Sequence, residues 1–144
     1  MTGTTVRAAT ESDAVSLAPL LAELGYPAPA GDIAARLRRL LAFGPAAALV
    51  AITQDQVVGL VTAHAFPTVH ADAPAAWLTT LVVAGVARRR GVGQRLVHAA
   101  EEWAAAAGAT RISVTSGAHR ADAHRFYERL GYDTTGRRFT RTLR

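Results

Sequence analysis

The sequence predicts a mixed α/β fold in which helices pack against a central sheet. Half of the 144 residues are apolar, which suits a domain that builds its core without disulfides or metal ions. Apolar residues repeat with helical spacing in some segments and form short strand-like runs in others. A basic, glycine-containing turn within residues 81–96 joins one such run directly to a helix. We therefore expect residues 1–144 to form a single domain.

The first half of the chain predicts a strand, two helices and a pair of strands. A short strand around Val6 precedes Thr10-Glu11-Ser12-Asp13, which resembles a capping box with Asp in place of Glu. The helix that follows carries apolar residues at helical spacing, and Gly25 is placed to end it. The remaining expected elements are a helix over about 32–43, a hairpin of strands over 47–52 and 57–66 with its turn at 53–56, and a loop over about 67–74.

The second half continues with alternating strands and helices. We expect a strand over 76–83, a helix that opens near Gly91 and ends at Gly108, a strand over 112–114 and a helix over 121–130. Two final strands are predicted over 132–135 and 139–143. The predicted order is β-α-α-β-β-β-α-β-α-β-β, a mixed sheet of about six or seven strands flanked by four helices.

The composition excludes several kinds of chemistry. The chain has no cysteine, so it has no disulfide, no thiolate metal site and no cysteine nucleophile. All sixteen basic residues are arginine, which rules out a Schiff-base lysine and the lysine of a P-loop. No apolar run is long enough to cross a bilayer, and the N-terminus lacks a signal-peptide pattern. We expect a cytoplasmic protein without a membrane partner.

The charge is unevenly distributed along the chain. Residues 1–84 hold four arginines and six acidic residues, whereas residues 85–144 hold twelve arginines and five acidic residues. The basic half, which contains the glycine turn, suits an anionic ligand. Nucleic acid would also be anionic, but no aromatic-interleaved stacking surface or nucleic-acid motif is visible. We therefore predict no nucleic-acid partner.

The turn between the apolar run and the helix favours phosphate binding. The N–H groups at a helix N-terminus point in one direction and carry positive potential, while glycines allow close approach of a ligand. A dinucleotide-binding fingerprint would need a third glycine at position 96, where Leu96 stands, and a Walker A loop would need lysine. An ordinary turn with solvated arginines is the structural alternative.

Two motifs in this half resemble one family. Arg88-x-x-Gly91-x-Gly93 resembles the acetyl-CoA signature of the GNAT superfamily of N-acyltransferases. Residues 123–132, Ala-His-Arg-Phe-Tyr-Glu-Arg-Leu-Gly-Tyr, are similar to the family's Ala-x-x-Phe-Tyr-Glu-x-x-Gly-Phe/Tyr segment, and the order of elements matches over essentially the whole chain. The chain departs from the family pattern at Gly85, where proline is common, and at Arg120, where many members have asparagine.

The resemblance implies the GNAT fold and an N-acetyltransferase that uses acetyl-CoA and no metal. Tyr127 would be the general acid for the leaving thiolate, and a backbone N–H near Val83 would stabilise the oxyanion. The acceptor would be an amine on a small molecule or a peptide, close to Gly25-Tyr26-Pro27. A homodimer is also possible, because members of the family frequently form dimers. The residues expected at the cofactor are Leu81, Val82, Val83, Arg88, Arg89, Arg90, Gly91, Val92, Gly93 and Gln94.

Two questions stay open at this level. The general base is undecided between a chain of waters and several side chains, which are His64, His70, Asp72, His119 and His124. The alternative function is an acetyl-CoA-binding sensor or partner subunit that does not turn over.

Overall fold

The computed structural model describes residues 3–115 and 121–144 and divides the chain into two compact units. The first unit runs to Ser113 and the second begins at Val114. The helices and strands are β1 (Thr4–Ala8), η1 (Glu11–Asp13), α1 (Ala14–Leu24), α2 (Ala30–Ala42), β2 (Ala46–Thr53), β3 (Gln56–Thr68), β4 (Ala71–Val83), η2 (Gly85–Ala87), α3 (Val92–Ala106), β5 (Ile112–Val114) and α4 (Ala121–Arg129).

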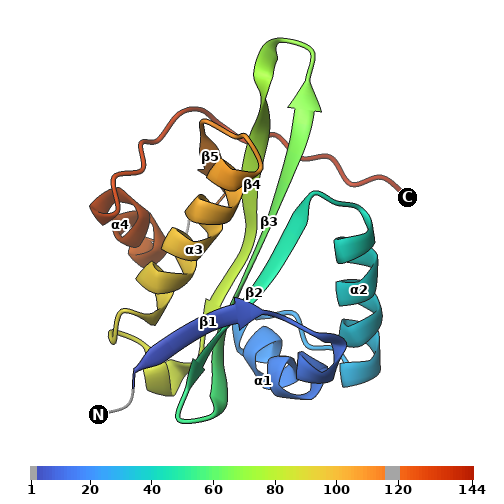
Figure 1. Cartoon of the computed structure of the whole chain (residues 1–144), viewed down its shortest axis with the longest axis vertical. Helices are drawn as coiled ribbons and strands as arrows, with labels where there is room; N and C mark the ends of the chain where they lie inside the picture. The colour runs from blue at the N-terminus through green and yellow to red at the C-terminus, as the bar shows by residue number, and fades with distance from the viewer. Residues whose placement is uncertain (1–2, 116–120) are drawn as a thin grey trace. The chain divides into compact units, whose positions relative to one another are not determined.

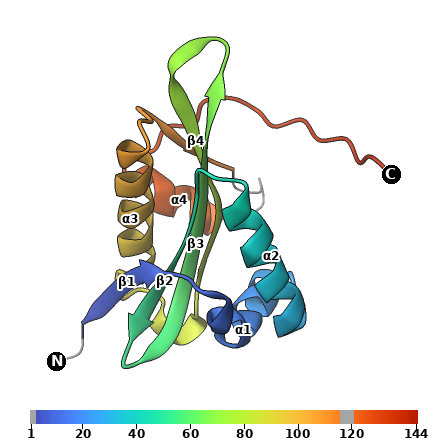
Figure 2. The same ribbon diagram turned by 45° about the vertical axis from the view of Figure 1, so that its right-hand side comes forward.

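The strands form one sheet in the order β1-β2-β3-β4-β5, and the first four are joined by antiparallel pairing (Figure 1). Helices α1 and α2 lie on one face of the sheet, and α3 lies on the other (Figure 2). The expected α/β architecture, with four α-helices in the described ranges, is therefore confirmed. Over the same ranges the sheet has five strands rather than six or seven.

The core of the first unit is built on both faces of the sheet. Leu17 of α1 and Leu96 of α3 are fully buried, as are Val50 and Val61 of the sheet. Gly59 brings α3 close to β3, because a Cβ at this position would lie 2.8 Å from Leu96 Cδ1. Close packing of this kind fixes where α3 begins relative to the end of β4.

The β2–β3 hairpin agrees with the prediction from the sequence, whereas the β3–β4 hairpin differs from it. Gln54 and Asp55, with φ of 52° and 62°, form a tight turn of the kind that joins β2 to β3. The loop expected over 67–74 is wrong, because β3 runs to Thr68 and β4 starts at Ala71. The pairing register shifts between Phe66 and Thr68, so Pro67 sits at an irregularity where its missing N–H leaves no gap in the ladder.

The helix ends follow the predicted glycines. Gly25 has a φ of 106° and caps α1, and Gly108 has a φ of 97° just after α3. Only glycine adopts this conformation without strain, so it stops a helix efficiently. The second helix starts at Ala30, two residues before its expected start.

The expected strands over 132–135 and 139–143 are wrong. Residues 132–144 contain no strand, and Phe139 and Leu143 are 90% and 82% exposed. Alternating apolar and polar residues predicted strands there, but a strand also needs a neighbour for its N–H and C=O groups. Among the residues that it describes, the structure provides no such neighbour for this segment.

Candidate functional site

The turn between β4 and α3 ends in a helix that lacks a side-chain cap. Gly91 is the N-cap residue of α3, has a φ of 78°, and offers no side chain to accept a hydrogen bond. The first hydrogen bond of the helix runs from the Arg95 N–H to the Gly91 carbonyl oxygen, at 3.1 Å. The N–H groups of Val92, Gly93 and Gln94 therefore have no acceptor within the helix. Such a group of donors attracts an anion.

The start of the turn is anchored by an acidic residue of α1. The Glu23 carboxylate accepts a hydrogen bond from the Gly85 N–H at 3.1 Å and lies 3.9 Å from the Arg88 guanidinium. Arg88 Nε donates to the Val83 carbonyl oxygen at 3.3 Å. Arg88 is thus turned back toward the end of β4. No local sequence pattern indicates the role of Glu23, because positions 23 and 85 are separated by 62 residues.

The next two arginines leave positive charge at the turn. Arg89 and Arg90 are exposed, and among the described residues neither has an ion pair with a carboxylate. Arg89 has a φ of 66°, a left-handed conformation that is unfavourable for a residue with a side chain. Backbone strain of this kind is concentrated at functional sites. The turn therefore combines uncapped N–H groups with two cations available to a ligand.

The end of β4 presents backbone groups beside this turn. Leu81 pairs with Val61 of β3 and Val83 pairs with Gly59. On its other side β4 has β5 as its neighbour in the sheet. Because β5 contains three residues and β4 contains thirteen, most of that edge of β4 has no partner strand in the described part of the chain. A free edge can pair with an extended ligand as it would with a strand.

The predicted general acid lies in the second unit. Tyr127 is a half-buried residue of α4, and its ring packs against Phe126 and Tyr132 at centroid distances of 5.1 and 5.6 Å. The Tyr132 N–H donates to the Tyr127 carbonyl oxygen at 3.0 Å, just beyond the end of the helix. These contacts give the Tyr127 ring a defined orientation within its unit.

The base candidates lie in different parts of the chain. His64 is half-buried on β3 and faces Trp77 across the β3–β4 ladder. His70 and Asp72 lie exposed at the far end of that hairpin, and His124 is exposed on α4. His119 is outside the described residues, as is Arg120. A polar pair, Thr62 and Thr79, shares a hydrogen bond of 2.8 Å between hydroxyl oxygens.

An ion pair between the exposed Arg7 and the buried Asp13 lies at the junction between β1 and η1. Both carboxylate oxygens of Asp13 accept hydrogen bonds of 2.8 Å from Arg7, and one also accepts the Thr10 N–H at 2.8 Å. The bond from Thr10 is part of the capping box expected from the sequence. The hydrogen bonds from Arg7 lower the pKa of Asp13 to about 2, because they stabilise its charged form. The charges of Arg7 and Asp13 are paired with each other, so this junction offers no unpaired charge to a ligand.

Two structural features are absent from the described residues. Within residues 3–115 and 121–144 no cluster of three histidine or acidic side chains is arranged to hold a metal ion. No helix in the same ranges has the length and apolar character needed to cross a bilayer.

Comparison with known proteins identifies the family of this chain. The model of the acetyltransferase (GNAT) family matches residues 19–132, so the chain belongs to this family. The match extends from α1 to Tyr132 and thus includes the β4–α3 turn and α4. The resemblance noted in the sequence is confirmed.

A named N-acetyltransferase shares part of the sequence. Aminoalkylphosphonate N-acetyltransferase from Salmonella typhimurium is 37% identical over 98 residues, which cover 65% of this chain. The matched segments span 61% of that relative and 40% of a second curated relative. The chain therefore matches these proteins over only part of their length.

Solved structures share the fold over nearly the whole chain. A protein described as a transcriptional regulator, from Bacillus halodurans, has a TM-score of 0.88 at 26% identity, covering 98% of this chain and all of that one. The aminoglycoside N-acetyltransferase AAC(6′)-Iy in complex with CoA has a TM-score of 0.87 at 18% identity, covering 100% and 97%. At that identity the second likeness concerns the fold alone.

Proposed function

We propose that this protein is an N-acetyltransferase that moves the acetyl group of acetyl-CoA to a primary amine. The observation that carries the proposal is the N-terminus of α3, where uncapped N–H groups lie beside two arginines that have no carboxylate partner among the described residues. A pyrophosphate is an anion that such a site suits. Family membership makes acetyl-CoA the natural source of that pyrophosphate.

The chain offers separate groups for separate parts of the cofactor. The backbone N–H groups from Arg89 to Gln94 would hold the pyrophosphate, with Arg89 and Arg90 adding charge-assisted hydrogen bonds. The backbone of Leu81, Val82 and Val83, at the end of β4, would pair with the pantetheine arm as a strand does. Arg88 is bonded to Val83 and lies near Glu23, so we assign it to shaping the turn rather than to direct binding.

The reaction requires a proton to be removed from the amine and a proton to be given to the departing sulfur. Bound acetyl-CoA would supply the activated acyl group. We assign the second proton to Tyr127, because a phenol with a pKa of about 10 is protonated at neutral pH and can donate. A backbone N–H near Val83 would stabilise the negative charge that develops on the carbonyl oxygen.

Among the candidates for the base, we propose His64 or a chain of waters first, with His70, Asp72, His119 and His124 as the remaining side chains to test. An alkyl ammonium has a pKa of about 10.4, so the amine needs help to become neutral at pH 7. Among the base candidates in the described residues, His64 lies within the paired region of β3, whereas His70 and Asp72 lie at the exposed end of the hairpin. A His64→Gln variant with an unchanged pH–rate profile would exclude His64 as the base.

The acceptor is defined only by class, and the relatives suggest where to begin. One relative is named for aminoalkylphosphonates and a structural neighbour for aminoglycosides. Both are small amines, so these two groups belong in the first panel together with amino acids and peptide N-termini. We place the acceptor near Tyr26, which is 68% exposed in the segment between α1 and α2.

The test is acetyl transfer to this amine panel, with product detection by mass spectrometry. For an active pair, Tyr127→Phe should lower kcat by about 100-fold to 10,000-fold and leave the Kd for acetyl-CoA nearly unchanged. Tyr132→Phe is the matched control, because it removes the same hydroxyl from the neighbouring ring and should keep most of the activity. Equal kcat for the wild type and Tyr127→Phe would exclude the acid role.

A second candidate is an acetyl-CoA-binding sensor or partner subunit without turnover. It is supported by the likeness to a structure described as a transcriptional regulator and by Arg120 at a position where many family members have asparagine. Calorimetry that shows tight CoA binding, together with no acetylated product from any amine in the panel, would favour this function.

A further inference from the structure

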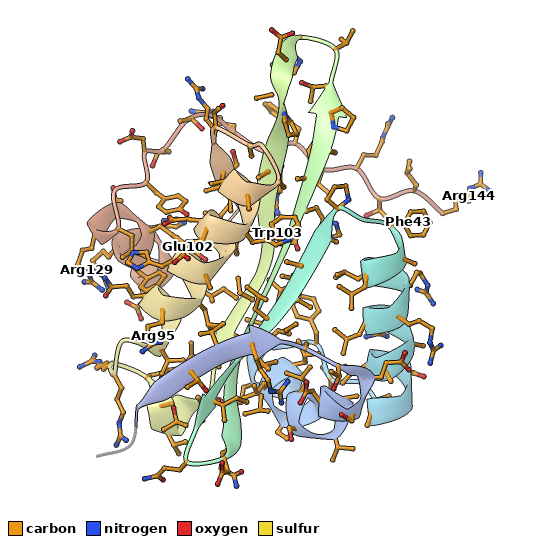
Figure 3. The ribbon with its side chains drawn as sticks, viewed as in Figure 1. Phe43, Arg95, Glu102, Trp103, Arg129 and Arg144 are labelled. Atoms are coloured by element: carbon orange, nitrogen blue, oxygen red, sulfur yellow. The ribbon has the colours of Figure 1, made fainter. Side chains whose placement is uncertain are left out.

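Glu23, in the last turn of α1, contacts the start of the β4–α3 turn at a point 62 residues further along the chain. Its Oε1 atom accepts a hydrogen bond from the Gly85 N–H at 3.1 Å and lies 3.9 Å from the Arg88 guanidinium. All three residues belong to the first unit. Figure 3 shows Arg95 near the start of α3, where this turn ends, so Glu23 holds the strand side of the turn that leads to the uncapped N–H groups.

The backbone conformation at position 85 does not require glycine. Gly85 begins the short helix η2 and lacks the left-handed conformation of Gly25 and Gly91. Ala84 before it is extended, with a ψ of 140°, which is the conformation that a residue before proline prefers. The first position of a helical turn also accepts proline. Position 85 could therefore hold a residue with a side chain, or even proline, without backbone strain.

The contact with Glu23 explains the glycine instead. A Cβ built on Gly85 would lie 3.4 Å from Glu23 Oε1, so a side chain there would crowd the carboxylate. The Gly85 N–H is the donor of the hydrogen bond, and proline has no N–H to donate. Position 85 thus suits the approach of a carboxylate from α1.

Glu23 also bears on the end of β4 through Arg88. The Ala84 N–H donates to the Val58 carbonyl oxygen at 2.8 Å, so the backbone groups of Ala84 face β3. Successive residues of a strand point these groups to opposite sides, so those of Val83 point away from β3. Arg88 Nε donates to the Val83 carbonyl oxygen at 3.3 Å. The Glu23–Arg88 contact therefore lies at the strand end where we place the pantetheine arm.

We propose that Glu23 is a positioning residue for acetyl-CoA, an inference that rests on the proposed function. Its carboxylate fixes Gly85 at the start of the turn and lies near Arg88, which is bonded to the end of β4. A turn that is already fixed loses less conformational freedom when it binds a ligand. Glu23 therefore raises the affinity for the cofactor without touching it.

The test measures CoA affinity by calorimetry, which needs no acceptor. Glu23→Ala should weaken CoA binding about tenfold, because the turn loses its hydrogen bond to a charged acceptor. Glu23→Gln should weaken it only about twofold to threefold, since the glutamine carbonyl oxygen can still accept the Gly85 N–H. Glu11→Ala is the matched control, because it removes an exposed carboxylate that pairs with Arg38 at 2.7 Å, and it should bind CoA like the wild type.

A double-mutant cycle identifies the contact that is responsible. Gly85→Pro removes the N–H donor and should weaken CoA binding about as much as Glu23→Ala. Adding Glu23→Ala to the Gly85→Pro variant should then cost less than about twofold, because only the exposed ion pair with Arg88 is left to lose. Effects of the two substitutions that multiply independently would contradict the proposal.

A second measurement needs no ligand. Exchange of the Gly85 amide proton with solvent should be faster in Glu23→Ala than in the wild type and unchanged in Glu11→Ala. Equal exchange in all three proteins would overturn the inference, as would wild-type CoA affinity in Glu23→Ala. A wild type that does not bind CoA at all would instead overturn the proposed function, and this inference with it. Circular dichroism on each variant separates a loss of affinity from a loss of fold.

Discussion

The β1–α1 and β4–α3 junctions both turn a strand into a helix, but they treat charge in opposite ways. At the β1–α1 junction, Asp13 accepts hydrogen bonds from Arg7 and from the Thr10 N–H. The arginine and the N–H group at the helix start therefore both have a partner within the protein. At the second, glycine caps the helix, and Arg89 and Arg90 have no carboxylate partner among the described residues. The β1–α1 junction, which we call the closed junction, stabilises the fold. The β4–α3 junction, which we call the open junction, leaves its N–H donors available to a ligand.

The largest expected effect comes from filling the open junction. Gly93 is the second residue of α3, and Gly93→Phe should weaken CoA binding at least about 100-fold, because a large side chain would occupy the approach to the N–H groups. Calorimetric titration with CoA measures this loss.

Gly31→Phe is the matched control for this change. Gly31 is the second residue of α2, and nothing lies within 4 Å of a Cβ built there. This variant should bind CoA like the wild type. Equal weakening by both substitutions would show that the effect comes from the fold rather than from the site.

Breaking the closed junction should cost stability and spare binding. Asp13→Asn removes the negative charge that pairs with Arg7 and weakens the acceptor of the Thr10 N–H, and it should lower the free energy of unfolding by about 2 kcal/mol. Urea denaturation measures the change. CoA affinity of the folded variant should match that of the wild type, and a large loss of affinity would contradict the separation between the two junctions.

Acid should act on the closed junction in the same direction. The pKa of Asp13 is lowered to about 2 in the folded state, from 3.8 without its partners. Its contribution is therefore fully present above about pH 4 and is lost as the pH falls toward 2. The difference in unfolding free energy between the wild type and Asp13→Asn should shrink over this interval, and a constant difference would argue against the ion pair as its cause.

The smallest effect is expected from a single cation of the open junction. Arg89→Gln should weaken CoA binding about tenfold, because one charge-assisted contact is lost while the N–H groups remain. Arg36→Gln, a change on α2 away from the turn, is the control. A loss as large as that of Gly93→Phe would mean that side-chain charge, rather than the backbone, dominates binding.

The sequence predicted most of the first unit because its signals are local. Helical spacing, the capping box before α1 and the glycines at 25 and 108 each act within a few residues of the element that they define. The β4–α3 turn was found for the same reason, since its glycines and arginines are contiguous. Family resemblance added the role of Tyr127, which no local pattern could supply.

The sequence could not predict features that depend on distant partners. Glu23 of α1 anchors the turn across 62 residues of sequence. Arg7 reaches Asp13 only because the chain bends between β1 and η1, and this bend is a property of the folded chain. The strand pattern over 139–143 failed in the opposite way. It was strand-like in sequence, but its apolar side chains remain exposed and no ladder forms there among the described residues.

Amide chemical shifts measured during a CoA titration test the account most directly. In ¹⁵N-labelled protein the amides from Gly91 to Gln94 should shift strongly as they begin to donate to the pyrophosphate, while those from Thr10 to Asp13 should stay in place. Saturated binding with unchanged signals at Gly91–Gln94 would contradict the claim that the main chain at the start of α3 holds the cofactor.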